Sequence, residues 1–191
     1  WAVSAVIFLW SFSPFLGTAQ FYYQADALKL SPVEIGCLAT IGGLAGALGA
    51  VLYGRLIGVW TLRQWLRAAV WIGVPLALTY LLYWGFASAV VVTAVAGLIG
   101  VALRLALMDL AAQSCPPGAE AVTFAAYMSV FNLAASGSNM AGGWLLAALR
   151  PRLPAYGCLA VLVVLGALCT AACWPLLTAA TRALPLGREA A

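Results

Sequence analysis

The sequence predicts an all-α membrane protein with six transmembrane helices, and three observations lead to this prediction. Of its 191 residues, 65% are hydrophobic and only 7% are charged, whereas water-soluble domains carry about 25% charged residues. The apolar residues gather in stretches of the roughly 20 residues that a helix needs to cross a bilayer. Short polar connections rich in proline or glycine separate these stretches. Lipid is therefore the expected solvent.

Six apolar segments are expected to cross the membrane as helices. The first contains Pro14, which removes a backbone hydrogen bond and predicts a kink. The second follows Ser31, a favourable N-cap, and has Pro32 at its first helical position. A Pro-Pro-Gly turn separates the fourth from the fifth. The expected segments are 1–25, 32–57, 66–86, 88–110, 120–149 and 155–178.

The basic residues predict how this bundle is oriented. Six crossings bring both ends of the segment to the same side of the membrane. Because cytoplasmic loops carry an excess of lysine and arginine, we expect both ends in the cytoplasm, with a bacterial cytoplasmic (inner) membrane as the location. Arg55, Arg63, Arg67, Arg182 and Arg188 lie on that side of the predicted bundle, and Lys29, Arg150 and Arg152 lie on the other.

Several classes of function are not supported by the composition. The basic residues are scattered, which argues against a nucleic-acid partner. The chain has no histidine, and its five cysteines are widely spaced among apolar residues, so neither a metal site nor a disulfide framework is predicted. There is no glycine-rich phosphate loop and no nucleophile beside a base. We therefore predict no enzymatic activity and no cofactor.

Two charged residues lie inside the predicted fourth helix. A charge at the bilayer centre costs roughly 2.5–3.5 kcal/mol on insertion scales, so such residues usually face a protein interior or a watery cavity. Arg104 and Asp109 lie about 140° apart around a helix, so each is expected to find a partner on another helix. The alternative is that both lie at the cytoplasmic interface, where they snorkel or cap the loop.

The predicted fifth helix carries one polar face. Its polar and small residues recur at i, i+4, i+7 and i+11, while Phe131, Leu133 and Met140 point elsewhere. Such a face should line a cavity or meet other helices. The second possibility is interhelical hydrogen bonding, worth about 0.6 kcal/mol for each bond. The face consists of Asn132, Ser136, Asn139 and Gly143.

The end of the first segment offers a second polar group. Gln20 and Gln24 are spaced i, i+4 and share a helix face, with Tyr23 close by. If this helix is shifted inward, Gln20 and Tyr23 would face a ligand. The alternative is that the aromatic residues form the interfacial belt at the far side of the membrane.

The second helix contains a stripe of small residues that recur every four positions. Small residues let membrane helices approach closely, and close packing drives their association. The stripe therefore predicts a tight helix contact in preference to a direct role in substrate binding. It consists of Gly42, Gly46, Ala50 and Gly54.

Two long motifs resemble the folate–biopterin transporter family. "FLWSFSPFLGTAQFYYQADALKLSPVEIGCLATIGGLAGALGAVLYGRL" is similar to the seventh and eighth helices of that family, and "MDLAAQSCPPGAEAVTFAAYMSVFNLAASGSNMAGGWL" to its tenth and eleventh. The loop "YGRLIGVWTLR" resembles the signature between the second and third helices of a half of major facilitator superfamily transporters. It lacks the aspartate of that signature and keeps Gly54, Arg55, Gly58 and Arg63.

The resemblance implies that this chain is the C-terminal six-helix half of a twelve-helix major facilitator fold. It implies secondary transport of folates, pteridines or related anions, by alternating access around a site near the membrane midplane. The N-terminal six-helix half would supply the rest of that site. Besides the lipid bilayer, the implied partners are a small-molecule substrate and protons.

The resemblance also suggests roles for the residues singled out above. Arg104 would attract an anionic carboxylate, and Tyr23 or Phe21 would offer a stacking face to an aromatic ring. Asp109 would be the titrating carboxylate that couples transport to protons. Glu120, at the start of the fifth helix, would serve as a helix cap or a gate. The groups expected to hydrogen-bond the substrate are Asn132, Ser136, Asn139 and Gln20.

Two alternatives belong to other classes. One is a membrane subunit or scaffold of six helices that transports nothing. The other is a major facilitator transporter for an unrelated substrate such as a sugar or a drug.

Overall fold

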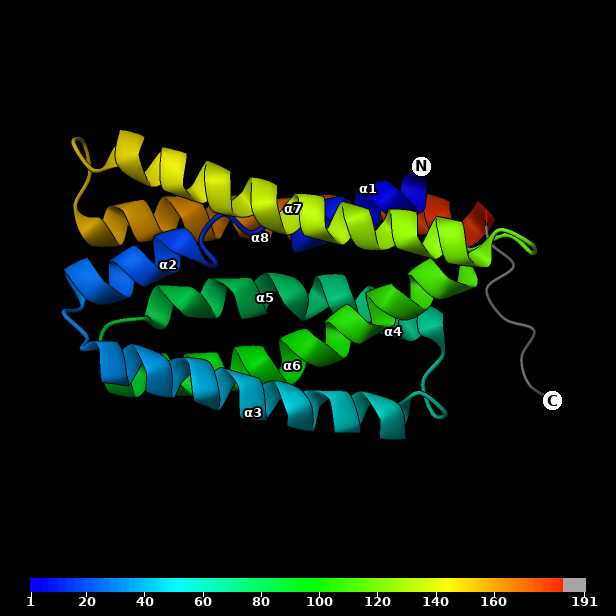
Figure 1. The fold of residues 1–191 in the computed structure, drawn as a ribbon, viewed down its shortest axis with the longest axis horizontal. Helices are drawn as coiled ribbons and strands as arrows, with labels where there is room; N and C mark the ends of the chain where they lie inside the picture. The colour runs from blue at the N-terminus through cyan, green and yellow to red at the C-terminus, as the bar shows by residue number, and fades with distance from the viewer. Residues whose placement is uncertain (184–191) are drawn as a thin grey trace.

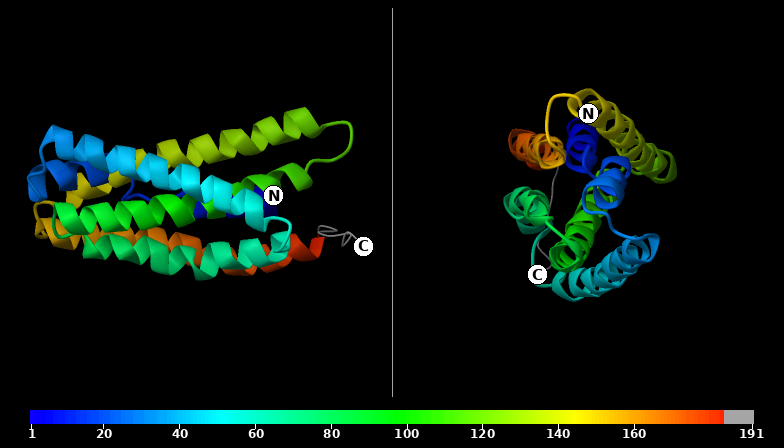
Figure 2. Two further views of the ribbon diagram at one scale, coloured as in Figure 1. Left: turned by 90° about the horizontal axis from the view of Figure 1, so that it is seen from below. Right: turned by 90° about the vertical axis from the view of Figure 1, so that its left-hand side faces the viewer.

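The computed structural model describes the backbone of residues 1–183 and the side chains of residues 1–178, and every regular element within them is helical. The chain runs back and forth along the long axis of the molecule (Figure 1). Turns at one end join α3 to α4 and α6 to α7, and the N-terminus lies at this end too (Figures 1 and 2). The elements are α1 (Ala2–Ser11), α2 (Thr18–Tyr22), the π-helical η1 (Tyr23–Ala27), α3 (Pro32–Leu56), α4 (Leu62–Trp71), α5 (Gly73–Leu78), the 3-10 helix η2 (Thr79–Leu82), α6 (Phe86–Gln113), α7 (Glu120–Leu149) and α8 (Ala155–Ala183).

Four helical stretches of the described chain are long and apolar enough to cross a membrane. A fifth helix, α1, is apolar but has only 10 residues, and α7 carries the polar face predicted from the sequence. The membrane character expected from the composition is therefore confirmed. The four stretches are Pro32–Leu56, Leu62–Leu82, Phe86–Gln113 and Ala155–Thr178.

The first predicted helix is interrupted, which corrects the single kinked helix expected over 1–25. α1 ends at Ser11, and helical structure resumes only at Thr18. Pro14 lies in the break and has no N–H to donate. Gly17 has φ of 84°, a left-handed conformation that glycine adopts without strain. The last part of the segment continues as a π-helical turn up to Ala27.

The third predicted segment begins earlier than the expected residue 66, because the sequence contains a capping box. The Thr61 hydroxyl accepts a hydrogen bond from the Gln64 backbone N–H, and the Gln64 side chain accepts one from the Thr61 N–H at 2.8 Å. These two bonds satisfy donors that a helix start leaves free. The box places the beginning of α4 at Leu62. Ser31 and Glu34 form the same arrangement at the start of α3, as the predicted N-cap requires.

The longest helix contact, between α3 and α6, is built on small residues (Figure 2). A Cβ at Gly49 would collide with the backbone carbonyl of Leu98, and one at Gly46 would lie 2.9 Å from Val101. On the α6 side, a Cβ at Gly97 would lie 2.5 Å from the Gly42 carbonyl oxygen. The predicted stripe thus lies partly in the contact. At its far end, the space where a Cβ of Gly54 would stand is open.

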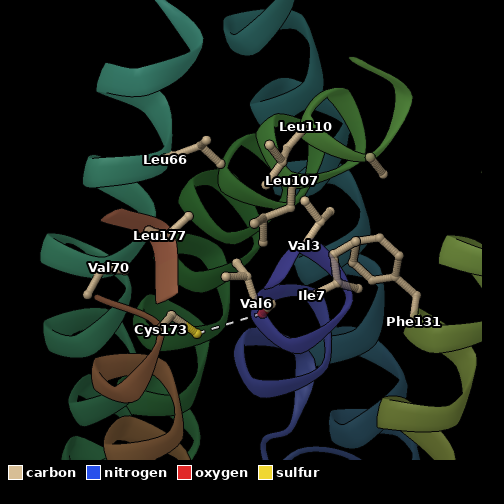
Figure 3. Packing of buried hydrophobic residues seen from close by; sticks show 11 residues of the cluster. Val3, Val6, Ile7, Leu66, Val70, Leu107, Leu110, Phe131, Cys173 and Leu177 are labelled. Atoms are coloured by element: carbon tan, nitrogen blue, oxygen red, sulfur yellow. Dashed lines mark hydrogen bonds between the residues drawn. The ribbon is translucent and has the colours of Figure 1, made fainter. Parts of the chain in front are cut away.

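A hydrophobic cluster joins α1 to its neighbours at the end of the molecule that holds the N-terminus (Figure 3). Cys173 is fully buried there, and its thiol lies 3.7 Å from the Val6 carbonyl oxygen. Phe131 of α7 lies against Ile7 on the other side of α1. The cluster fixes the α1 segment that leads into the break. Its members are Val3, Val6, Ile7, Leu66, Val70, Leu107, Leu110, Ala111, Phe131, Cys173 and Leu177.

Candidate functional site

A cavity of about 350 Å³ lies among the helices next to the break between α1 and α2. Ligand sites for small molecules commonly measure about 300–1,000 Å³ and are mostly apolar with a few placed polar groups. This cavity fits that description. It is lined by Trp10, Ser11, Ser13, Phe15, Leu16, Gly73, Leu76, Ala77, Tyr80, Ala96, Gly100, Val101, Arg104, Phe131, Ala135, Val163 and Thr170.

Arg104 is the charged residue of the cavity wall. It lies on α6, about 14 Å from the last residue of that helix at 1.5 Å per residue, and therefore within a helix that can cross a membrane. Within the described part of the chain its guanidinium has no hydrogen bond and no ion pair. The guanidinium instead lies over the ring of Phe131, whose centre is 5.7 Å from the guanidinium carbon. An intramembrane cation that lacks an anionic partner is a functional-site hypothesis by default.

Aromatic rings form much of the remaining wall, and other contacts hold them in place. The Trp10 indole N–H donates to the Ala69 carbonyl at 3.1 Å, which fixes the ring between α1 and α4. The rings of Phe15 and Tyr80 meet edge to face with centres 5.2 Å apart. Such a wall is preorganised for a flat apolar or aromatic ligand.

Two hydroxyl groups of the cavity wall are in different situations. The Thr170 hydroxyl donates to the Gly166 carbonyl of its own helix, as threonine commonly does within helices. The Ser11 oxygen is buried and has no hydrogen-bond partner among the described residues. An unsatisfied buried polar group costs about 1–3 kcal/mol. The wall therefore combines a cation that lacks an anionic partner among the described residues, several fixed rings and the buried, unpaired Ser11 hydroxyl.

The predicted polar face of α7 lies outside this cavity. Asn132, Ser136 and Asn139 are exposed, while the opposite face of the helix is buried against the bundle. Asn139 contacts the chain itself, because its side-chain oxygen accepts a hydrogen bond of 3.2 Å from the Thr18 backbone N–H. Phe131 is buried on another face of α7, whereas Leu133 and Met140 are exposed.

Gln20 and Tyr23 lie in a separate polar network near the end of α2 and η1. The buried Tyr23 hydroxyl donates to the Tyr83 carbonyl at 3.1 Å. The side-chain amides of Gln20 and Gln24 donate to the Tyr83 hydroxyl at 3.4 and 3.0 Å. Gln20 also lines a smaller hollow of about 220 Å³. Neither Gln20 nor Tyr23 lines the cavity that contains Arg104.

Asp109 and Arg104 do not pair with each other, as the helical spacing predicts. One Asp109 oxygen accepts from the Tyr53 hydroxyl at 3.3 Å, which links α6 to α3. The other accepts from the Gln113 side chain at 3.2 Å. Glu120 is exposed in the first turn of α7. In the described part of the chain no group of histidine, cysteine and acidic residues is placed to hold a metal ion.

The sequence patterns did not indicate a role for Tyr83, Trp10 or Ser11. Tyr83 is fully buried and its hydroxyl meets Thr93 at 2.8 Å. Its only signal was a place near the end of an apolar segment, which an interfacial tyrosine shares. Ser11 and Trp10 precede Pro14 by three and four residues, about one helical turn. A helix break is therefore the signal that would have indicated them, because broken membrane helices expose backbone and side chains to a cavity.

Comparisons with known proteins agree on one family. The model of the BT1 family matches residues 1–184. A folate-biopterin transporter of Synechocystis sp. is 30% identical over 141 residues, which are 67% of this chain and 28% of that protein. A probable folate-biopterin transporter 4 of Arabidopsis thaliana is 30% identical over 141 residues, 68% of this chain and 29% of that protein.

The matched region thus spans less than a third of the length of these relatives. No solved structure matches the chain. Both relatives are named as transporters, in agreement with the absence of a catalytic motif from the sequence. Because the family model covers nearly the whole sequence, the chain is an integral membrane protein that belongs to the BT1 family.

Proposed function

We propose that this chain is part of a secondary transporter for small anionic aromatic metabolites of the folate and pterin type. The observation that carries the proposal is Arg104, an arginine within a membrane helix that faces a ring-lined cavity and has no anionic partner among the described residues. A carboxylate substrate would neutralise this cation with charge-assisted hydrogen bonds. The names of the two relatives support the choice of substrate.

The arrangement of the chain supports six crossings. Four stretches are each long and apolar enough to cross the membrane: Pro32–Leu56, Leu62–Leu82, Phe86–Gln113 and Ala155–Thr178. The interrupted segment from α1 to η1 and the long α7 run beside them (Figure 1). We propose that the six passes form the C-terminal half of a major facilitator fold, with both ends in the cytoplasm. The exposed face with Asn132 and Ser136 would then meet the N-terminal half or the pathway between the halves.

Alternating access in this proposal moves the two halves about a site near the membrane midplane. Asp109 is the carboxylate proposed for proton coupling. It is half-buried at the contact of α6 with α3, where it accepts a hydrogen bond from the Tyr53 hydroxyl. Loss or gain of a proton there would change a hydrogen bond between two packed helices, which is one way that coupling acts on helix positions.

The test is uptake of labelled folate and labelled biopterin by cells that express the full-length protein, with Arg104→Ala at matched membrane levels. Hydrogen bonds to charged groups are worth about 1.5–3 kcal/mol, so the apparent affinity for folate should fall about 10- to 150-fold. Biopterin carries no carboxylate, so its uptake should fall less. Arg67→Ala is the matched control, because Arg67 is exposed on α4 and lies outside the cavity.

Three outcomes would contradict the proposal. Equal losses for folate and biopterin in the Arg104 variant would remove the carboxylate role of this residue. No uptake of either compound by the wild-type protein would favour an unrelated substrate, such as a sugar or a drug. A full-length gene without a second set of six helices would instead favour a subunit or scaffold.

A further inference from the structure

We propose that Asn139 of α7 is a positioning residue, which caps α2 from another helix and thereby fixes the broken segment that walls the Arg104 cavity. The inference rests on the proposed function in one respect, namely that this cavity is the substrate site. It differs from the expectation that Asn139 contacts the substrate, since Asn139 is not among the residues of the cavity wall.

The start of α2 lacks a cap of its own. The N-cap position is Gly17, which has no side chain to accept the free N–H groups of the first turn. The Asn139 side-chain oxygen accepts the Thr18 N–H at 3.2 Å instead. Asparagine is among the preferred capping residues, and a cap stabilises a helix start by about 1 kcal/mol. Here the cap comes from a residue 121 positions away in the sequence.

Close packing makes the contact between α7 and the break specific. A Cβ at Gly17 would collide with the Asn139 amide, and the φ of 84° already favours glycine there. One turn along α7, a Cβ at Gly142 would collide with the Pro14 carbonyl oxygen. A glycine is therefore needed on each side: Gly17 in the break admits Asn139, and Gly142 in α7 admits Pro14.

The segment held in this way forms one wall of the cavity. Phe15 and Leu16 lie between the two contacts with α7 in the sequence, Ser13 directly precedes the first of these contacts, and all three residues line the cavity. On the α8 side the same segment is confined by Gly166, where a Cβ would lie 3.1 Å from the Ser13 hydroxyl oxygen. A shift of the break would therefore move Phe15, a buried ring that packs on Tyr80.

Hydrogen–deuterium exchange on the purified full-length protein tests the cap directly. In Asn139→Ala the Thr18 amide loses its acceptor, and peptides that cover residues 12–22 should exchange about 5-fold faster, the change that corresponds to about 1 kcal/mol. Asn139→Asp should retain the wild-type rate, because a carboxyl group keeps an acceptor oxygen in either protonation state. Ser136→Ala should also retain it, since Ser136 lies one turn away on the same face. Unchanged exchange in Asn139→Ala would overturn the proposal.

Folate transport separates a positioning role from direct contact. If Asn139 acts through the break, Asn139→Ala should raise the KM for folate several-fold, and Asn139→Asp should restore it. If Asn139 touched the substrate, the added carboxylate would repel anionic folate, so Asn139→Asp would transport less well than Asn139→Ala. That order would overturn the proposal. Met140→Ala, at the neighbouring exposed position on α7, is the control for non-specific effects on this helix.

A double variant supplies a further test. Gly17→Ala should reduce transport because its methyl group collides with Asn139, and Asn139→Ala should relieve part of that loss. Additive losses would contradict a direct contact between the two positions. If the wild-type protein transported no folate while the exchange rates followed the expected pattern, the proposed function would fail and the cap itself would stand.

Discussion

The guanidinium carbon of Arg104 lies 5.7 Å from the centre of the Phe131 ring, so a cation on α6 rests against an aromatic face on α7. Phe131 is 3% exposed and packs into the cluster around α1. The ring is therefore fixed and in turn fixes the arginine head group. Cation–π contacts contribute about 0.5–1 kcal/mol at exposed sites and about 2 kcal/mol when desolvated.

Phe131→Leu should therefore weaken the binding of anionic substrates by disordering Arg104. Leucine keeps most of the apolar contact within the cluster. Alanine would leave a cavity and lower the free energy of unfolding by about 3–5 kcal/mol. We expect the KM for folate to rise a few-fold, with little change for biopterin, in uptake assays at matched membrane levels. An equal rise for both compounds would show that the substitution distorts the cavity as a whole.

Gly97→Ala should destabilise the contact between α3 and α6. The new methyl group would lie 2.5 Å from the Gly42 carbonyl oxygen, a backbone atom that cannot rotate away. Overpacking of this kind costs about 1–3 kcal/mol, which should lower the thermal unfolding midpoint of the detergent-purified protein. Gly54→Ala is the matched control, because beyond the neighbouring backbone of its own helix no atom lies within 4 Å of its Cβ position. Similar midpoints for the two variants would contradict the assigned contact.

The small-residue contact shows how far periodicity alone predicts packing. Spacing by four selected Gly42 and Gly46, which do face α6, and also Gly54, which does not. It missed Gly49, where a side chain would strike the Leu98 backbone. A repeat of four drifts around a helix that has 3.6 residues per turn. Residues spaced by four therefore rotate out of the contact face after about two helical turns.

Residues of the candidate site were predictable when burying them in lipid costs free energy. They were less predictable when their role depends on which groups lie next to them in the fold. A charge such as Arg104 must avoid hydrocarbon, so its position in the sequence indicates a site. The side-chain amide of a residue such as Asn139 can form a hydrogen bond either with a ligand or with a backbone N–H. Helical spacing does not distinguish these two partners. The chosen partner, the Thr18 N–H, exists because α1 is broken. That break was expected only as a kink at Pro14.

Asp109→Asn should flatten the pH dependence of uptake, because an amide cannot exchange a proton with the medium. The variant keeps an oxygen that can accept the hydrogen bond from the Tyr53 hydroxyl, so the contact with α3 is retained. The measurement is folate uptake over a series of external pH values at matched membrane levels. Tyr53→Phe is the control that should stay pH-dependent, since it retains the carboxyl group. An unchanged pH profile in Asp109→Asn would exclude this residue from coupling.

Tyr83→Phe should destabilise the protein more than the loss of a single hydroxyl suggests. That hydroxyl meets the side chains of Gln20, Gln24 and Thr93. Tyr83 is fully buried and Gln24 is only 5% exposed, so the Gln24 amide would lose its acceptor in a place that water does not reach. A buried polar group without a partner costs about 1–3 kcal/mol, which should appear as a lower thermal unfolding midpoint.

Tyr156→Phe provides the comparison for this prediction. Its hydroxyl donates one hydrogen bond, to the Leu81 carbonyl at 3.1 Å, and unlike Tyr83 the residue is exposed. Other groups can replace that bond at an exposed position, so its loss should lower the midpoint much less. A further variant, Tyr83→Phe combined with Gln24→Leu, removes both partners of the buried bond. It should recover part of the stability, because an apolar pair of similar shape no longer buries an unsatisfied Gln24 amide. A double variant less stable than Tyr83→Phe alone would show that Gln24 contributes through contacts other than the Tyr83 hydroxyl.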